Sequence, residues 1–375
     1  SWNTRQYDRF MINPTLFTKI TLPLGFSFRM DYTPRLDTRK RFDFDEKGNP
    51  QNAVDEGRRR HNQVFAWQWN NILNWDKAFG DHRFSVTALY NAERNKRWET
   101  DSRTSNFSPT AALGYHAMGF GTNPSAGSYD EVNSRTALMG RVNYAFGDKY
   151  NLSASVRRDG FSRFGTENLY GNFPSISGAW TLTNEDFMAS VPPWLNYLKL
   201  RASWGINGNS SGLEDYNAYA KLDNDIYLNY DGGYFPAPYV EITRIANPEL
   251  SWEKTEAINF GLDFGLFGSR LSGSLDIYTS ETKDLLLDQK LPDLTGLPSA
   301  KTNIGNLKNN GFDLGLNSTN ISSTDFVWTS SLNFSYNTNK ITTLGNDPLP
   351  VTDAEGNPVL DGSGNPVLAE PDDLQ

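Results

Sequence analysis

The sequence predicts an all-β fold, a transmembrane antiparallel β-barrel, and three observations support this prediction. The first is a two-residue alternation of apolar and polar side chains, because successive side chains of a strand point to opposite faces. The second is length, since many of the alternating segments run about 9 to 12 residues, which suits a tilted crossing of a hydrocarbon layer. The third is the sorting of the connections into short turns and long polar loops, as in outer-membrane barrels.

The composition agrees with a barrel and argues against several other classes. The chain has 375 residues, a formal net charge of −9, 13% aromatic residues and no cysteine, with a mean hydropathy of −0.59. The lack of cysteine excludes a disulfide scaffold. No stretch approaches the roughly 18 to 20 uninterrupted apolar residues of a spanning helix, whereas a barrel keeps a polar average because half of its side chains face the lumen. The acidic balance argues against nucleic acid as a partner.

About twelve strands are predicted in this pattern. In order along the chain they are 7–18, 25–33, 62–74, 82–93, 135–145, 149–158, 173–182, 196–206, 255–266, 270–280, 303–318 and 326–340. Short connections at 19–24, 76–82, 146–149, 267–270 and 321–325 contain turn residues such as Gly-Asp and Gly-Ser. The long connections, which we expect to be extracellular loops, are at about 34–60, 95–133, 159–172, 207–253, 282–302 and 342–375.

Charged residues take the polar side of these strands. They are Arg29, Asp31, Arg83, Arg141, Arg157, Lys199, Arg201, Asp263, Asp276 and Asp313. The opposite register would expose the basic members of this set to lipid, at about 2–4 kcal/mol each near the midplane and on the order of 10–20 kcal/mol in total. Because this exceeds the stability of a typical domain, we expect these side chains to form a lumen wall.

Aromatic residues fall near the strand ends on the apolar side, as two interfacial girdles would require. Tyr32, Tyr90, Trp204 and Tyr336 lie towards the long loops, and Tyr144, Tyr150, Trp180, Phe264 and Trp328 lie towards the short turns. A soluble β-sandwich would also alternate, but its connections do not sort into a short end and a long end.

From Tyr150 onward the chain contains five more specific sequence blocks. They are SVRRDGFSRFG at 155–165, YGNFPSISGAW at 170–180, LKLRASWGINGN at 198–209, NPELSWEKT at 247–255 with its continuation to 287, and NIGNLKNNGFDL at 303–314. These blocks, in this order, resemble the SusC/RagA-like TonB-dependent outer-membrane transporters of the Bacteroidota. Residues 1–149 fit as earlier strands of the same barrel.

The resemblance implies a barrel of about 22 strands, filled by an N-terminal plug and capped outside by a SusD-like lipoprotein. Family members import glycans or peptides, driven by the TonB complex, which they contact through an N-terminal region. No plug, TonB-binding segment or closing strand is recognisable here, and both ends are expected to be truncated. The chain is therefore expected to be a partial barrel, in multi-pass contact with the lipids of the cell outer membrane.

Some motif residues suggest structural roles. Arg157, Arg158, Asp159 and Arg163 lie where a strand enters a loop, so we expect an inter-strand charge network, with substrate contact as the alternative. Trp252 is expected to anchor a strand start at the headgroup level, because indole rings favour that interface.

The candidates for catalysis and metal binding are weak. His61, His82 and His116 each stand alone in sequence, and no nucleophile–base pair is recognisable. Asp223, Asp225 and Asp231 could supply oxygen ligands to a loop calcium ion, but the Gly and Glu of an EF-hand loop are missing. We therefore expect no enzyme activity, no metal and no cofactor.

The long loop 207–253 is the strongest candidate for contact with a ligand or partner. It carries Tyr216, Tyr219, Tyr227, Tyr230, Tyr234, Phe235 and Tyr239, and Trp98 lies in a second such loop. These rings could stack on sugars or grip a protein, or could pack the loop against its neighbours. The sequence thus predicts part of an outer-membrane TonB-dependent importer of glycans or peptides, working with a SusD-like lipoprotein. The alternative is a structural or adhesive outer-membrane barrel whose long loops bind a partner protein or surface.

Overall fold

The computed structural model describes residues 3–46, 54–189, 192–228, 234–291 and 293–344. The chain divides into two compact units. Unit 1 comprises Ser1–Asn74, Thr87–Leu138 and Gly160–Ser162, and unit 2 comprises Trp75–Val86, Met139–Asp159 and Arg163–Gln375. No helix in the described ranges is long and apolar enough to cross a membrane.

The strands form one antiparallel 13-stranded sheet in the order β1-β3-β4-β5-β6-β7-β8-β9-β12-β13-β16-β17, with β2 paired to β3. The predicted all-β, antiparallel class is confirmed. The order is an open path that ends at β1 and β17 within the described part of the chain. The predicted strand 7–18 is wrong, because it is divided into β1 (Asn3–Ile12) and β2 (Leu16–Thr21). Pro14 lies in the gap, and proline cannot donate to a strand ladder.

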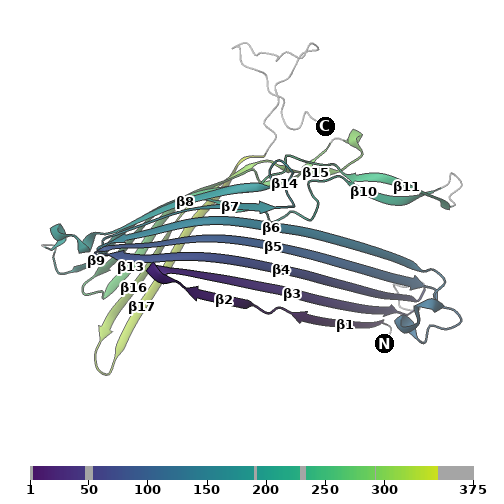
Figure 1. Cartoon of the computed structure of the whole chain (residues 1–375), viewed down its shortest axis with the longest axis horizontal. Helices are drawn as coiled ribbons and strands as arrows, with labels where there is room; N and C mark the ends of the chain where they lie inside the picture. Colours follow the sequence, from purple (N-terminus) through teal and green to yellow (C-terminus); the bar gives the residue numbers. More distant parts are fainter. Residues whose placement is uncertain (1–2, 47–53, 190–191, 229–233, 292, 345–375) are drawn as a thin grey trace, which may run out of the picture. The chain divides into compact units, whose positions relative to one another are not determined.

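Unit 1 consists of β1, β2, β3 (Phe26–Asp45) and the adjoining parts of β4 (Glu56–Phe79), β5 (His82–Ser105) and β6 (Ser125–Phe146). Strands β3, β4, β5 and β6 are 20, 24, 24 and 22 residues long and lie side by side (Figure 1). A hydrocarbon crossing takes only about 9–11 residues. The strands therefore continue through much of 34–60 and 95–133, which were expected to be loops, and Trp98 lies within β5.

Short 3-10 helices accompany the strands of both units. Before β3 lies η1 (Pro23–Gly25), and η2 (Gly114–Phe120) lies between β5 and β6. Between β8 and β9 lie η3 (Leu182–Asn184) and η4 (Asp186–Met188), and η5 (Asp293–Thr295) follows β14.

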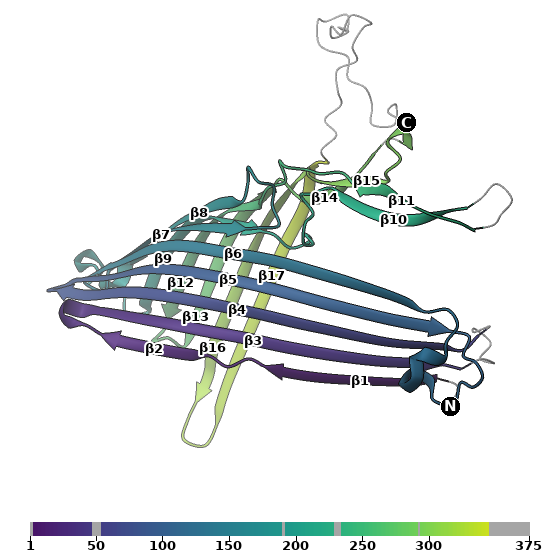
Figure 2. The same ribbon diagram turned by 45° about the vertical axis from the view of Figure 1, so that its right-hand side comes forward.

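Unit 2 contains the remaining strands of the sheet. They are most of β7 (Tyr150–Phe161), β8 (Tyr170–Thr181), β9 (Leu195–Asn209), β12 (Glu253–Leu266), β13 (Leu271–Lys283), β16 (Asn306–Ser322) and β17 (Val327–Thr343). Two extra hairpins, β10 (Lys221–Leu228) with β11 (Tyr234–Arg244) and β14 (Leu286–Lys290) with β15 (Ser299–Asn303), occupy ranges expected to be loops (Figure 2).

The short connections behave as their sequences predict. In the β6–β7 turn, Gly147 and Asp148 have φ values of 53° and 54°, and the Lys149 amide donates to the Phe146 carbonyl at 3.0 Å. Two successive positive φ angles match the right-handed twist of a two-residue hairpin, and Gly-Asp tolerates them.

The register of unit 2 confirms the predicted alternation. Leu200, Leu262, Leu275, Leu314 and Phe334 oppose one another across five neighbouring strands. The next row is Arg201, Gly261, Asp276, Asp313 and Ser335. Leu200 is 42% exposed and Phe334 is 51% exposed. One face of this sheet is thus apolar and uncovered within the described unit, and the other is polar.

Candidate functional site

Arg201 is the centre of the polar face in unit 2. Its Nε and Nη2 donate to the Asp263 carboxylate at 2.9 Å each, and its Nη1 and Nη2 donate to the Asp276 carboxylate at 3.0 Å each. Asp263 is on β12 and Asp276 is on β13, so one guanidinium links three strands through two bidentate contacts. Such planar, paired geometry is the strong form of the charge-assisted hydrogen bond.

Gly261 makes this arrangement sterically possible. In register it lies between Arg201 and Asp276, and a Cβ at this position would stand 2.5 Å from the Arg201 Cζ. The guanidinium therefore lies directly over the backbone of β12. Sequence reasoning selected Arg201, Asp263 and Asp276 but missed Gly261, although a glycine inside a strand often marks such a close approach.

The other predicted wall residues lie on strands of the two units. On β3 in unit 1, Arg29 pairs with Asp31 at 2.9 Å. In unit 2, Arg83 pairs with Asp148, and Arg157 pairs with Asp159 at 2.7 Å. The remaining members follow the same alternation: Arg141 is on β6, Lys199 faces Asp263 in register, and Asp313 faces Asp276. Their position on a lumen stays a prediction.

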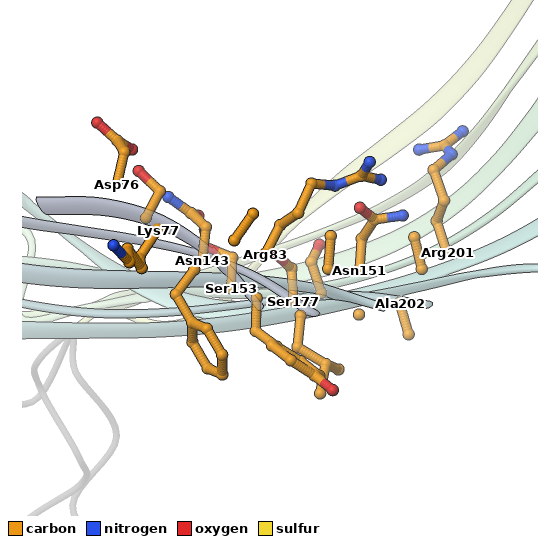
Figure 3. Close-up of a pocket in the computed structure, with 18 of the residues that line it drawn as sticks. Asp76, Lys77, Arg83, Asn143, Asn151, Ser153, Ser177, Arg201 and Ala202 are labelled. Carbon is orange, nitrogen blue, oxygen red and sulfur yellow. The ribbon is translucent and has the colours of Figure 1, made fainter. Parts of the chain in front are cut away.

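A hollow of about 750 Å³ lies on this polar face of unit 2. Its polar lining includes Arg83, Asn143, Asn151, Ser153, Ser177 and Arg201. The polar tips of Arg83, Asn151 and Arg201 extend to one side of the sheet, and Ala202 points to the other (Figure 3). Amide and hydroxyl groups beside guanidinium groups can donate to and accept from a polar, uncharged ligand.

Unit 1 has a second polar feature that the sequence reasoning missed. The side chain of Asp37 is 0% exposed and lies 2.9 Å from Arg9, 3.2 Å from Arg35 and 2.8 Å from Arg39. The signal was present, because Arg and Asp recur at every second position from Arg35 to Asp45. The predicted strand ends at residue 33, whereas β3 continues to Asp45, so these residues fall in a range expected to be a loop.

The ion pairs of unit 1 continue across its neighbouring strands. Arg60 of β4 lies 3.2 Å from Asp101 of β5, and Arg97 lies 2.7 Å from Glu99 and 3.4 Å from Glu131 of β6. The strands that extend beyond the predicted crossing length are thus connected side by side by charged side chains as well as by the backbone.

Trp252 corrects one expectation. It is 7% exposed, and its ring packs at 4.5 Å from Phe164 and 5.4 Å from Phe173 between centroids. Its Nε1 donates to the Leu169 carbonyl at 3.3 Å. A headgroup anchor is therefore wrong for Trp252, which forms a small buried core with Leu250, because two neighbouring motifs fold over it.

The recognised motif blocks converge on this outer core. A Cβ on Gly165 would stand 1.7 Å from the Pro248 carbonyl oxygen. Ser251 and Asn303 exchange two hydrogen bonds, with the Ser251 amide donating at 2.7 Å and the Asn303 Nδ2 donating at 2.8 Å. Arg163 was expected to join the Arg157 network, but it reaches Asp215 at 2.5 Å. In this structure the blocks pack against one another and are hydrogen-bonded at the base of the long connections.

The aromatic residues proposed for ligand contact are distributed over the loop and its hairpin. Tyr216 and Tyr219 form an edge contact at 6.4 Å and are 40% and 47% exposed. Tyr227 is on β10, and Tyr234, Phe235 and Tyr239 are on β11. Tyr230 lies outside the described residues. Trp98, on β5, lies beneath the Lys96 ammonium at 4.5 Å.

The histidines lie in structural surroundings. The His82 Nδ1 lies 2.8 Å from the Tyr144 hydroxyl, and His116 packs beside Tyr115 at 4.3 Å. His61 is an exposed residue of β4. Within the described ranges, no group of three or more His, Cys, Asp or Glu residues could hold a metal ion. Asp231, one of the three suggested calcium ligands, lies outside those ranges, so a calcium ion in this loop stays a prediction from the sequence.

Known proteins similar to this chain are bacterial TonB-dependent receptors. TonB-dependent receptor P39 of Formosa agariphila is 31% identical over 346 residues, covering 91% of this chain and 32% of that protein. SusC of Bacteroides thetaiotaomicron is 37% identical over 222 residues, covering 58% of this chain and 22% of that protein. A solved structure of the RagAB peptide transporter has a TM-score of 0.81 at 26% identity, covering 92% of this chain and 38% of that chain.

The chain spans about a third of the length of P39 and less of SusC. Its residues 2–367 match the family described as TonB dependent receptor-like, beta-barrel. This family is one of outer-membrane transporters and receptors. The two-faced antiparallel sheet, the motif blocks and these relatives agree, and the chain belongs to the TonB-dependent receptor-like β-barrel family, with SusC/RagA-like relatives.

Proposed function

We propose that this chain forms part of the barrel of an outer-membrane TonB-dependent importer. The observation that carries the proposal is the two-faced sheet, in which an exposed apolar row containing Leu200 adjoins a polar row held by Arg201. A sheet with these faces can contact lipid on one side and line an aqueous passage on the other. Import would proceed by binding and gated passage, without a covalent step.

We infer that the cargo is a glycan or a peptide. The polar hollow of unit 2 offers Asn143, Asn151, Ser153 and Ser177 beside Arg201, and these groups suit the amides of peptides as well as the hydroxyls of sugars. A peptide is supported by the likeness to the RagAB peptide transporter.

We further propose a SusD-like lipoprotein as partner at the outer end, and energy input from the TonB complex. The outer core around Trp252 holds the base of the long connections, and the hairpin β10–β11 extends from this region of unit 2 with the exposed Tyr216 and Tyr219 at its base. Exposed tyrosines are favoured in recognition surfaces because they bury a large area at low entropic cost.

Deletion of the gene that encodes the chain tests import. Cells that lack it should lose uptake of labelled oligopeptides or of labelled oligosaccharides, and complementation should restore uptake of one class. Unchanged uptake of both classes, with loss of cell attachment to a surface, would favour the structural or adhesive alternative.

Removal of residues 221–244 tests the partner surface separately. The shortened protein should reach the outer membrane, because β10 and β11 form a sheet of their own, but it should bind less lipoprotein in a pull-down. Tyr216→Ala with Tyr219→Ala should have the same effect in a milder form. A normal pull-down together with normal uptake in both variants would contradict the proposed role of this loop.

A further inference from the structure

The apolar face of unit 1 ends in basic side chains at its outer end. Along β5 the outward-alternating residues are Tyr90 and Ala92, followed by Arg94 and Lys96. Along β4, read towards the long connections, they are Trp69, Trp67, Phe65 and Gln63, followed by His61 and Arg59. On β3 the corresponding basic residue is Lys40. The basic residues of β4 and β5 thus follow the aromatic residues in the direction of the long connections.

The aromatic residues mark where a membrane surface would lie. Trp69 and Tyr90 form an edge contact at 6.2 Å and are 38% and 44% exposed. Partly exposed Trp and Tyr rings on an apolar face are typical of the headgroup level. Arg94 and Lys96 follow Tyr90 at two and three steps of the alternation, or about 13 and 20 Å along a strand that rises about 3.3 Å per residue. They therefore reach the headgroup region and the layer just outside it.

The basic residues of this face differ in pairing from those of the polar face. On the polar face of the same strands, Arg39, Arg60 and Arg97 each lie within 3.4 Å of a carboxylate. Within the described part of the chain, Lys40, Arg59, Arg94 and Lys96 take part in no ion pair, and Lys96 and Arg59 lie over aromatic rings instead.

A hollow lies beside two of these residues, Lys40 and Arg59. It measures about 370 Å³ and is lined by Lys40, Phe42, Arg59, Arg60, His61, Thr100 and Ser102. Arg59 lies 5.0 Å from the centroid of Phe42, and the Phe42 ring also stacks on Tyr115 of η2 at 5.5 Å between centroids. Basic groups with two hydroxyls around such a volume can hold a phosphate group together with part of a sugar.

Unit 2 repeats the pattern independently. At the outer end of its apolar face, Lys254 opposes Lys283 and Lys308 opposes Lys340. Like charges directly opposite on neighbouring strands are destabilising unless a counter-charge is present. Glu281 lies 3.4 Å from Lys283 and faces Lys308 in register, which leaves Lys340 at the end of the row.

We propose that the basic residues at the outer end of the apolar face bind the phosphate groups of a lipid A-type glycolipid in the outer leaflet. The inference rests on the proposed membrane location, and charge complementarity identifies the occupant. Acidic strand residues on this face of unit 1 are restricted to Asp8, which opposes Lys40, and Asp130. A phosphorylated headgroup would supply the missing negative charge, and its acyl chains would lie along the apolar rows below.

The test uses the full-length protein, isolated from the outer membrane in mild detergent, with bound lipid A counted by native mass spectrometry. Arg94→Ala with Lys96→Ala should lower bound lipid A about tenfold, because two charge-assisted contacts are removed. The matched control is Arg97→Ala with Arg103→Ala, which removes the same charge from the opposite face of the same strand and should leave lipid A bound. An equal loss in both variants, or no loss in either, overturns the proposal.

Two further arms keep the test decisive. If the alanine variant does not reach the outer membrane, Arg94→Gln with Lys96→Gln is measured after reconstitution in phosphatidylcholine nanodiscs with and without diphosphoryl lipid A. Lipid A should bind the wild-type protein but not this variant, and equal binding overturns the proposal. Inorganic phosphate alone should give no stable adduct, and an adduct as stable as that of lipid A would overturn the assignment to a membrane lipid. A normally assembled variant that lacks lipid A leaves the import proposal unaffected.

Discussion

Arg201 of β9 and Asp276 of β13 are joined by two hydrogen bonds of 3.0 Å, although β12 runs between their strands. The contact exists because the intervening residue is Gly261, over which the guanidinium lies. Arg201 and Asp276 are 33% and 21% exposed, so the pair is partly withdrawn from water. A side-chain connection of this kind fixes the relative register of three strands in addition to the backbone ladder.

Gly261→Ala should weaken this connection. The new Cβ would stand 2.5 to 2.7 Å from the Arg201 guanidinium atoms, so the guanidinium must shift and its contact with Asp276 would weaken. The expected loss is about 1–3 kcal/mol of unfolding free energy, measured by urea unfolding of the detergent-solubilised protein. Gly140→Ala is the control, since no heavy atom lies within 4 Å of a Cβ there. Equal stability of the two variants would contradict the proposed role of Gly261.

The assignment of faces makes a second prediction. Leu200→Arg should impair assembly into the outer membrane, because an arginine on the lipid face costs about 2–4 kcal/mol near the midplane. Lys199→Leu, one residue away on the polar face, should assemble almost normally. Arg201→Leu is a poorer comparison, because it leaves two carboxylates without their guanidinium. Membrane fractionation measures assembly, and similar defects in Leu200→Arg and Lys199→Leu would contradict the assignment of the two faces.

Much of the sheet was predictable from local pattern. A two-residue period is a property of any strand, so Leu200 and Arg201 could be placed on opposite faces without knowledge of their neighbours. Short turns such as Gly147-Asp148 were predictable because their backbone angles require particular residues. The outer ends of β3 to β6 were not predictable, because these parts are rich in charged residues and lack a clear alternation of apolar and polar side chains. A segment with many charged residues has the same composition as a solvated loop.

The features that sequence reasoning missed depend on contacts between distant segments. Trp252 is buried because Phe164 and Phe173, more than seventy residues earlier in the chain, pack on it. The local sequence around a tryptophan at the start of a strand does not show whether its side chain is exposed or buried. Gly261 is informative only once Arg201 and Asp276 are known to flank it in register.

The outer core yields a third prediction. Gly165→Ala should open it, because a Cβ 1.7 Å from the Pro248 carbonyl oxygen forces a backbone shift. We expect a local loss of about 1–3 kcal/mol, seen as faster amide hydrogen exchange in residues 160–175 and 245–255. Gly119→Ala has free space for its Cβ and should exchange like the wild type. Unchanged exchange in the Gly165 variant would mean that the motifs do not depend on this contact.

Glu185 makes acid stability testable at the opposite end of the strands. It lies in the β8–β9 connection, where Tyr150 donates to its carboxylate, Trp180 Nε1 donates at 2.9 Å and Lys149 donates at 3.1 Å. These hydrogen bonds, with that of Tyr150 the strongest, lower the pKa of Glu185 to about 2. A carboxyl group with a lowered pKa stabilises the folded state above its unfolded pKa of about 4.3 and loses that contribution as the pH falls through the folded value.

The stability of the wild-type protein should therefore decline between about pH 4.3 and pH 2 as Glu185 takes up a proton. Glu185→Gln should be less stable at neutral pH and should show a flatter profile in this window, since an amide does not titrate. Thermal midpoints followed by tryptophan fluorescence at intervals between pH 2 and 6 measure the effect. The control is Glu167→Gln, at an exposed position, which should keep the slope of the wild type. A Glu185→Gln profile parallel to that of the wild type would show that the hydrogen bonds to Glu185 contribute nothing to acid stability, because loss of the titrating group must remove its share of the slope.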